Sequence, residues 1–215
     1  RNLSESRDCV MLNGAMTDYA KEASGPVRRI SASHHDDAQP SIEDCARRLV
    51  AVDLDNAKPA GWDIRRPLVG AKAIMQDMGF ADVSFVLQLT SKQRPDGSNC
   101  RMRIYFLLAD PIYSSRRVYM LKRLKAMHPH LGLDSSTGLM SQPIYIGNPY
   151  IEDGEDFIDR RIIFCPGKRD YADMPELPDA PAAQVNNAYP ESDWPDAGKE
   201  LSIITSSDDL HGQIF

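Results

Sequence analysis

The sequence lacks any apolar run long enough to cross a membrane, and no signal peptide is recognisable in it. It also lacks a C-x-x-C pair, because its four cysteines are widely spaced. This spacing argues against a structural zinc site and favours reduced thiols. We therefore expect a cytoplasmic protein with no membrane partner. The chain opens on Arg1 rather than methionine, which predicts an excised fragment or a processed product.

The net charge of −6 is distributed unevenly over the 215 residues. Residues 169–215 contain ten acidic and two basic residues, which gives this segment a charge of −8. Residues 1–168 contain 21 acidic and 23 basic residues, a charge of +2, so the acidic total does not exclude nucleic-acid binding by this part. Five prolines and little periodicity predict that residues 169–215 form an extended or partly ordered acidic tail or linker.

The order of predicted elements from residue 47 indicates an α/β protein of the α+β type. Apolar and polar residues alternate in several strand-like runs, and two segments have an amphipathic helical pattern. The predicted elements are a strand at 47–55, a helix at 66–78, strands at 83–90 and 101–108, a serine-capped helix at 114–127, and short strands near 143–146 and 160–165. This β-α-β-β-α-β order is the split βαβ plan, in which the first and third strands are adjacent and both helices cover one face. Upstream, Ser41 and the two acidic residues after it predict a helix start.

The strand at 47–55 ends in the most informative motif of the chain, Asp53-Leu54-Asp55. Successive side chains of a strand point to opposite faces, so the two aspartates share one face and the apolar residues share the other. Two carboxylates about 7 Å apart along a strand repel each other unless a cation neutralises them. Hard divalent cations prefer carboxylate oxygen. An isolated D-x-D also occurs as two solvated aspartates at a strand end.

The face that carries these aspartates also receives side chains from the neighbouring strand. The alternation at 101–108 places Arg101, Arg103 and Tyr105 on the side opposite the core. Asp–Arg pairs across strands are ordinary structural contacts, but the same set suits a metal–phosphate site in which arginines receive the phosphates. Asp134, which follows the second helix, is the best candidate for a third carboxylate in such a site.

These motifs, in this order, resemble those of the archaeo-eukaryotic primase superfamily, and in particular the primase-polymerases of plasmids, phages and mobile elements. The D-x-D after an apolar strand looks like the first motif of the family. The strand at 101–108 is similar to the second motif, with Arg103 where a histidine is usual. Asp134 and the Q-P-I-Y segment that follows it resemble the third motif. The resemblance covers residues 47–168.

The resemblance implies a DNA primase-polymerase, which transfers nucleotides under the direction of a single-stranded DNA template. It implies an RRM-like catalytic palm at residues 47–168, with an open sheet face that carries the site. Residues 1–46 would form a small N-terminal subdomain that helps to hold template or nucleotide. The substrates would be NTP or dNTP, and a helicase domain or another replication protein would be a partner.

The resemblance also implies a role for each matched residue. The carboxylates that would hold two Mg²⁺ or Mn²⁺ ions and support catalysis are Asp53, Asp55 and Asp134. The ions would bridge the attacking 3′ hydroxyl and the incoming triphosphate. The residues that would contact nucleotide phosphate are Arg103, Arg101 and Lys92. Arginine can bind phosphate bidentately, so its presence in place of histidine is chemically sensible.

Three alternative interpretations remain. His128 and His130 flank a proline, with Tyr145 or Tyr150 downstream, which resembles the histidine pair and nucleophilic tyrosine of rolling-circle nickases and relaxases. Proline is poorly tolerated in the paired strand that such enzymes use, so a loop at the helix end is favoured. A non-catalytic nucleic-acid-binding module would stack bases on exposed aromatic residues, and only Tyr105 qualifies on the predicted open face. The third alternative is an inactivated primase fold.

Overall fold

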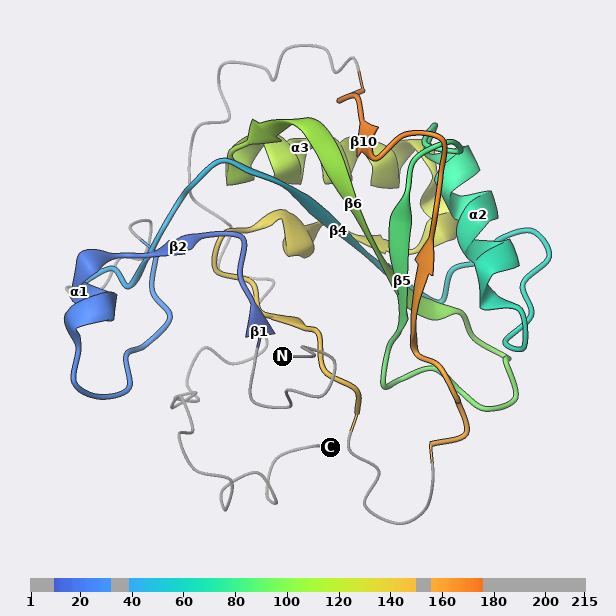
Figure 1. Ribbon diagram of the computed structural model, residues 1–215, viewed down its shortest axis with the longest axis horizontal. Helices are drawn as coiled ribbons and strands as arrows, with labels where there is room; N and C mark the ends of the chain where they lie inside the picture. Colours follow the sequence, from blue (N-terminus) through green and yellow to red (C-terminus); the bar gives the residue numbers. More distant parts are fainter. Residues whose placement is uncertain (1–9, 32–38, 150–155, 176–215) are drawn as a thin grey trace.

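The computed structural model describes residues 10–31, 39–149 and 156–175, which form a mixed α+β fold with a mostly antiparallel sheet (Figure 1). The helices and strands of this part are β1 (Val10–Met11), β2 (Ala15–Met16), α1 (Asp18–Glu22), β3 (Ile42–Glu43), β4 (Arg47–Asp55), α2 (Pro67–Asp77), β5 (Phe85–Leu89), β6 (Arg101–Ile112), α3 (Ser114–Met127), β7 (Leu133–Asp134), β8 (Ile144–Tyr145), β9 (Ile162–Cys165) and β10 (Tyr171–Ala172). None of the helices described is long and apolar enough to span a membrane.

The main sheet has the strand order β7-β4-β6-β5-β9, and β10 runs parallel to the end of β6. The predicted adjacency of the first and third strands is confirmed, because β4 pairs with β6 along most of its length. The sheet also includes residues 171–172 in β10, within the segment that the charge pattern assigned to the acidic tail. The rest of that tail, residues 176–215, lies outside the described residues.

One face of this sheet forms the core together with α2 and α3. The predicted alternation is confirmed in the stretches that face the core, since Val50, Val52 and Leu54 of β4 are buried, as is every second residue from Met102 to Leu108 of β6. The core residues of these four elements include Val50, Val52, Leu54, Ile74, Met75, Met102, Ile104, Phe106, Met120 and Leu121. The opposite face, called the open face below, carries no helix of the core cluster and bears the polar side chains of β4 and β6.

The predicted helix start at Ser41 is wrong. Residues 42–43 form β3, which pairs with β2, and the Ser41 hydroxyl accepts a hydrogen bond from the Ile30 amide at 2.9 Å. The nearby acidic residue Asp44 caps α3 instead. The Asp44 carboxylate accepts hydrogen bonds from the amide and hydroxyl of Ser114, at 3.1 and 2.6 Å. The predicted serine cap of α3 is therefore replaced by Asp44, which lies 70 residues earlier and favours the positive end of the helix.

The strand predicted near 143–146 exists but belongs to another sheet, because β8 pairs with β1. One edge of the main sheet is formed by β7. This strand has only two residues, which is too short for an alternating pattern to be recognised in the sequence. Asn13 connects the N-terminal elements to the turn that follows β7, because its side-chain amide donates to the Thr137 carbonyl at 2.6 Å. In Figure 1, β2 and α1 lie at the side of the molecule away from α2.

Candidate functional site

The predicted site residues lie on the open face, in two rows that cross neighbouring strands. In the first row, Asp53 of β4 lies between Asp134 of β7 and Arg103 of β6, with each pair directly opposite. In the second row, Asp55 lies opposite Arg101. Residues that are opposite in an antiparallel pair share a face and have Cβ atoms about 4.5–5.5 Å apart. The structure therefore brings together all three predicted carboxylates and both predicted arginines.

Arg103 binds Asp53 through two parallel hydrogen bonds. Its Nε and Nη2 atoms lie 3.2 and 3.1 Å from the two carboxylate oxygens. Both side chains are largely buried, with exposed fractions of 12% and 19%. Burial raises the pKa of the Asp53 carboxyl, and the negative charges of Asp55 and Asp134 add to this, although Arg103 opposes it. The Asp53 carboxylate is thus held in a crowded anionic environment that one arginine does not fully neutralise.

The second ion pair is more exposed. Arg101 donates from Nη1 to the Asp55 carboxylate at 2.5 Å, and the Asp55 side chain is 52% exposed. The Nη1 atom of Arg103 donates to the Tyr145 carbonyl at 3.0 Å, which ties β8 to the open face. Burial lowers the pKa of the Arg103 guanidinium, but Asp53 outweighs this and raises it overall. Arg103 therefore stays charged in any condition that leaves the protein folded.

Asp134 is positioned by the turn that follows it. Its carboxylate accepts hydrogen bonds from the amide and hydroxyl of Ser136, at 2.9 and 2.7 Å. The hydroxyl of Thr137 donates to the Ala51 carbonyl at 2.8 Å, which fixes this turn against β4. Asp134 is therefore held in the site by the short 3-10 turn that follows it, and this turn is hydrogen-bonded to β4.

A glycine allows β7 to reach β4. Gly132 has a φ of +57°, and a Cβ atom at this position would lie 2.0 Å from the Asp55 carbonyl oxygen. The Gly132 carbonyl in turn accepts a hydrogen bond from the Asp55 amide at 3.0 Å. Only glycine adopts this left-handed conformation and also permits such a close approach of two backbones. Gly132 thus positions β7, and with it Asp134, beside β4. Its role was not predicted from the sequence, where its place two residues before Asp134 was the available signal.

The three carboxylates do not converge on one point in this structure. Asp53 faces Arg103, Asp55 faces Arg101, and Asp134 faces its own turn. Among the described residues, no group of three His, Cys, Asp or Glu side chains is arranged to hold a metal ion. The donor set nevertheless fits hard divalent ions, because three carboxylates share one face of the sheet.

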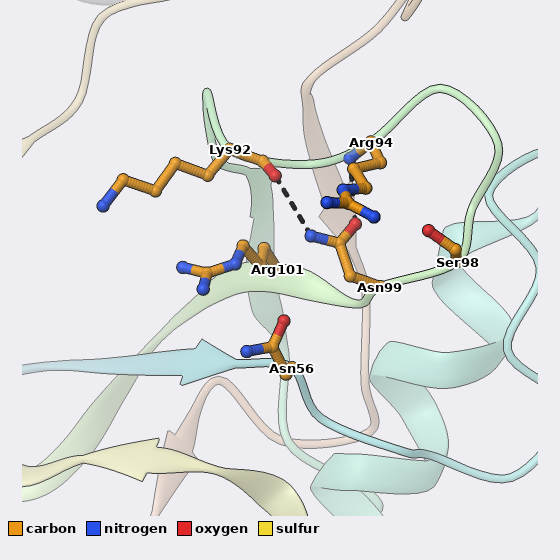
Figure 2. Close-up of a pocket in the computed structure, with 6 residues that line it drawn as sticks. All are labelled: Asn56, Lys92, Arg94, Ser98, Asn99 and Arg101. Atoms are coloured by element: carbon orange, nitrogen blue, oxygen red, sulfur yellow. Dashed lines mark hydrogen bonds between the residues drawn. The ribbon is translucent and has the colours of Figure 1, made fainter. Parts of the chain in front are cut away.

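An open hollow of about 570 Å³ adjoins the second row (Figure 2). Its lining residues are Asn56, Lys92, Arg94, Ser98, Asn99 and Arg101. Neither Lys92 nor Arg94 has a carboxylate within ion-pairing distance among the residues that the structure describes. Figure 2 shows Arg101 and Asn56 below the loop that carries these two cations. Lys92, predicted as a phosphate contact, therefore lies beside Arg101 in a cationic hollow, and Arg94 joins it there.

A buried glutamine builds the loop above this hollow. The Gln93 side chain is 2% exposed, and its amide nitrogen donates to the Asn99 and Arg94 carbonyls at 2.7 and 3.1 Å. Its carbonyl oxygen accepts from the Arg101 amide at 2.8 Å. The Asn99 amide closes the loop by donating to the Lys92 carbonyl at 3.1 Å (Figure 2). The cations of the hollow thus project from a hydrogen-bonded loop, which was not predicted from the sequence.

The histidine pair lies apart from this face. Pro129 begins a 3-10 turn after α3, so the expected loop at the helix end is confirmed. His130 Nε2 lies 3.1 Å from the Asp77 carboxylate of α2, a helix of the core face. Tyr145 meets the open face through its backbone contact with Arg103, and Tyr150 lies outside the described residues. The structure therefore does not bring Tyr145 and the histidine pair into one site.

Comparison of the chain with protein-family models, with curated proteins and with solved structures finds no match.

Proposed function

We propose that this chain is the catalytic domain of a DNA primase-polymerase of the archaeo-eukaryotic primase superfamily, acting in the replication of a plasmid, phage or mobile element. The observation that carries the proposal is the pairing of Asp134 directly opposite Asp53, with Asp55 two residues further along the same face. Asp134 follows Asp55 by 79 residues in the sequence, yet the sheet places it on the same face as the two carboxylates of β4. Such a set is typical of sites that transfer nucleotides with divalent ions.

The strand order supports this proposal independently of the aspartates. The four strands β7-β4-β6-β5, with α2 and α3 in one core on one face, have the strand order of the split βαβ plan, which supports the proposed RRM-like palm. The N-terminal elements adjoin the palm through the β1–β8 pair, and β8 contacts Arg103 on the open face. This arrangement suits a role of the N-terminal elements in holding template or nucleotide.

Asp53, Asp55 and Asp134 would hold two Mg²⁺ or Mn²⁺ ions, which supply charge neutralisation at the attacking 3′ hydroxyl and the triphosphate. The hollow beside Arg101 offers cations for the phosphates of the incoming NTP or dNTP. Lys92 and Arg94 project from an ordered loop, so binding a phosphate there does not require the loop backbone to become ordered.

Arg101 and Arg103 have a double role in this proposal. Each now binds a carboxylate that is a proposed metal ligand. When a triphosphate binds the arginines, their aspartates lose a positive partner, and divalent ions can replace it. When divalent ions bind the aspartates, the arginines lose a negative partner, and the triphosphate can replace it. We therefore expect nucleotide and metal to strengthen each other's binding.

The test is nucleotide incorporation on a primed single-stranded template with Mg²⁺ or Mn²⁺. Asp53→Asn and Asp134→Asn are expected to reduce extension by at least about 100-fold, because the metal contributes several kcal/mol of charge stabilisation. Asp110→Asn, an exposed aspartate on β6 away from the site, is the matched control and should extend like the wild type. Extension by Asp53→Asn at the wild-type rate, or none by the folded wild type with either metal, contradicts the proposal.

A second candidate is a non-catalytic nucleic-acid-binding module on the same fold. The observation that favours it is the pairing of Asp53 and Asp55 with arginines, which removes much of the repulsion that bare carboxylates would exert on phosphate. This candidate predicts metal-independent binding of single-stranded DNA by a folded protein that extends no primer. The same experiment, with a binding measurement added, therefore separates the two functions.

A further inference from the structure

The open face continues from the charged rows into a surface of exposed apolar side chains. We define this aromatic surface by three residues, Leu107, Phe164 and Tyr171. Phe164 of β9 lies opposite Val86, and Tyr171 of β10 lies opposite Leu107. The neighbours of both rings along their strands, Cys165 and Ala172, are core residues, so the rings lie on the open face. The exposed fractions are 59% for Phe164, 44% for Tyr171 and 37% for Leu107.

The aromatic surface is continuous with the candidate site. Tyr105 lies on β6 two residues from Arg103, on the same face, and about 7 Å further along the strand. It is opposite Val86, which in turn lies opposite Phe164. A chain of three register partners therefore leads across β6, β5 and β9 from the charged row to the exposed ring of Phe164. A ligand extended over this face would meet both parts.

Three exposed cations lie on or beside the strands of this surface. The Arg48 guanidinium lies 5.5 Å from the centre of the Tyr171 ring, in a cation–π contact. Arg160 and Lys168 are exposed at the two ends of β9. Within the described part of the chain, none of these three cations has a carboxylate at ion-pairing distance. Exposed rings with unpaired cations beside them complement a polyanion whose bases are accessible, which is a single strand and not a duplex.

We propose that the aromatic surface binds single-stranded nucleic acid by stacking its bases on Phe164 and Tyr171. The phosphates lie toward Arg48, Arg160 and Lys168. The strand leads from this surface along Tyr105 to the carboxylate row, so it occupies the place of a template. That last assignment rests on the proposed function, whereas the stacking itself requires neither metal nor nucleotide.

The test is fluorescence anisotropy with a labelled oligothymidylate of about twelve nucleotides, in EDTA, at several salt concentrations. Each ring is expected to be worth between about 5-fold and 150-fold in affinity, so Phe164→Ala with Tyr171→Ala should weaken binding by at least about 20-fold. Phe164→Leu keeps an apolar side chain and should still lose most of the Phe164 contribution. Tyr113→Ala, an exposed aromatic residue at the start of α3, is the matched control and should bind like the wild type.

The salt dependence separates stacking from charge. The ring variants should lower affinity without changing the slope of log affinity against log salt, whereas Lys168→Ala should reduce that slope by about one unit. Asp110→Asn, away from the carboxylate row, should leave binding in EDTA unchanged. Because this assay contains neither metal nor nucleotide, a failed polymerase proposal does not affect its result. Unchanged affinity in the double ring variant, no binding by the wild type at low salt, or dimerisation that the ring variants abolish would each overturn the inference.

Discussion

Truncation of Gln93 tests whether the cationic hollow is a preformed part of the fold. In Gln93→Ala, the Arg101 amide and the Asn99 carbonyl lose their side-chain partner inside a loop where Gln93 itself is almost fully buried. Each orphaned backbone group costs about 1–3 kcal/mol, and water can replace part of this at the loop surface. We therefore expect the free energy of unfolding to fall by about 2–4 kcal/mol, measured by urea denaturation with an unchanged m-value.

The same variant has a functional readout, because Gln93 lies between Lys92 and Arg94 in the loop. Under the proposed function, loosening the loop should raise the apparent KM for nucleotide more than it lowers kcat, since the cations are then positioned only at a cost in entropy. Gln76→Ala, which truncates an exposed glutamine of α2, should change stability by less than about 0.5 kcal/mol. A stability loss below about 0.5 kcal/mol for Gln93→Ala would refute the argument that this side chain builds the loop.

Two further predictions concern backbone approach and burial. Gly132→Ala should lower the free energy of unfolding by about 2–4 kcal/mol in urea denaturation, because its Cβ would collide with the Asp55 carbonyl. Under the proposed function it should also reduce primer extension. Gly25→Ala, with open space around the glycine, should be neutral, and equal stability of the two variants would contradict the geometry. Burial raises the pKa of the Cys100 thiol to about 12, so at pH 8 it should resist alkylation in the folded protein and react once urea unfolds it, as followed by peptide mass spectrometry. Rapid native alkylation of Cys100 would show that this part of the core opens.

The parts of the fold that the sequence predicted are those governed by regular alternation. β4 and β6 are long, and apolar residues alternate with polar ones around Asp53 and Arg103, so the faces of these two residues follow from the pattern alone. Their pairing follows from the order of helices and strands, because a strand–helix–strand–strand run favours that adjacency. The rows that join Asp53 to Arg103 and Asp55 to Arg101 then required only the correct register.

The parts that could not be predicted depend on contacts between distant residues. β7 has two residues, and its place beside β4 is fixed by Gly132 and by the bond from Thr137 to Ala51. The cap of α3 comes from Asp44, which lies far upstream in the sequence. An acidic residue does favour a helix N-terminus, but Asp44 caps α3 and not a helix that begins at Ser41. Exposed aromatic residues on β9 and β10 were missed because strands of two to four residues give little periodicity.

The arginine at position 103 gives the site a property that a histidine would not. A guanidinium is charged at every pH at which the protein folds, so Arg103 holds Asp53 by two hydrogen bonds even without metal or nucleotide. A histidine is a weaker base and would hold its charge over a narrower pH range than a guanidinium, whereas burial, together with Asp55 and Asp134, raises the pKa of the Asp53 carboxyl. The arginine therefore stabilises this face of the sheet, and under the proposed function an ion on Asp53 would displace it from that carboxylate. Under the proposed function, the cost of this exchange makes metal binding depend on the phosphate that recruits Arg103, so the ligands assemble together and not one by one.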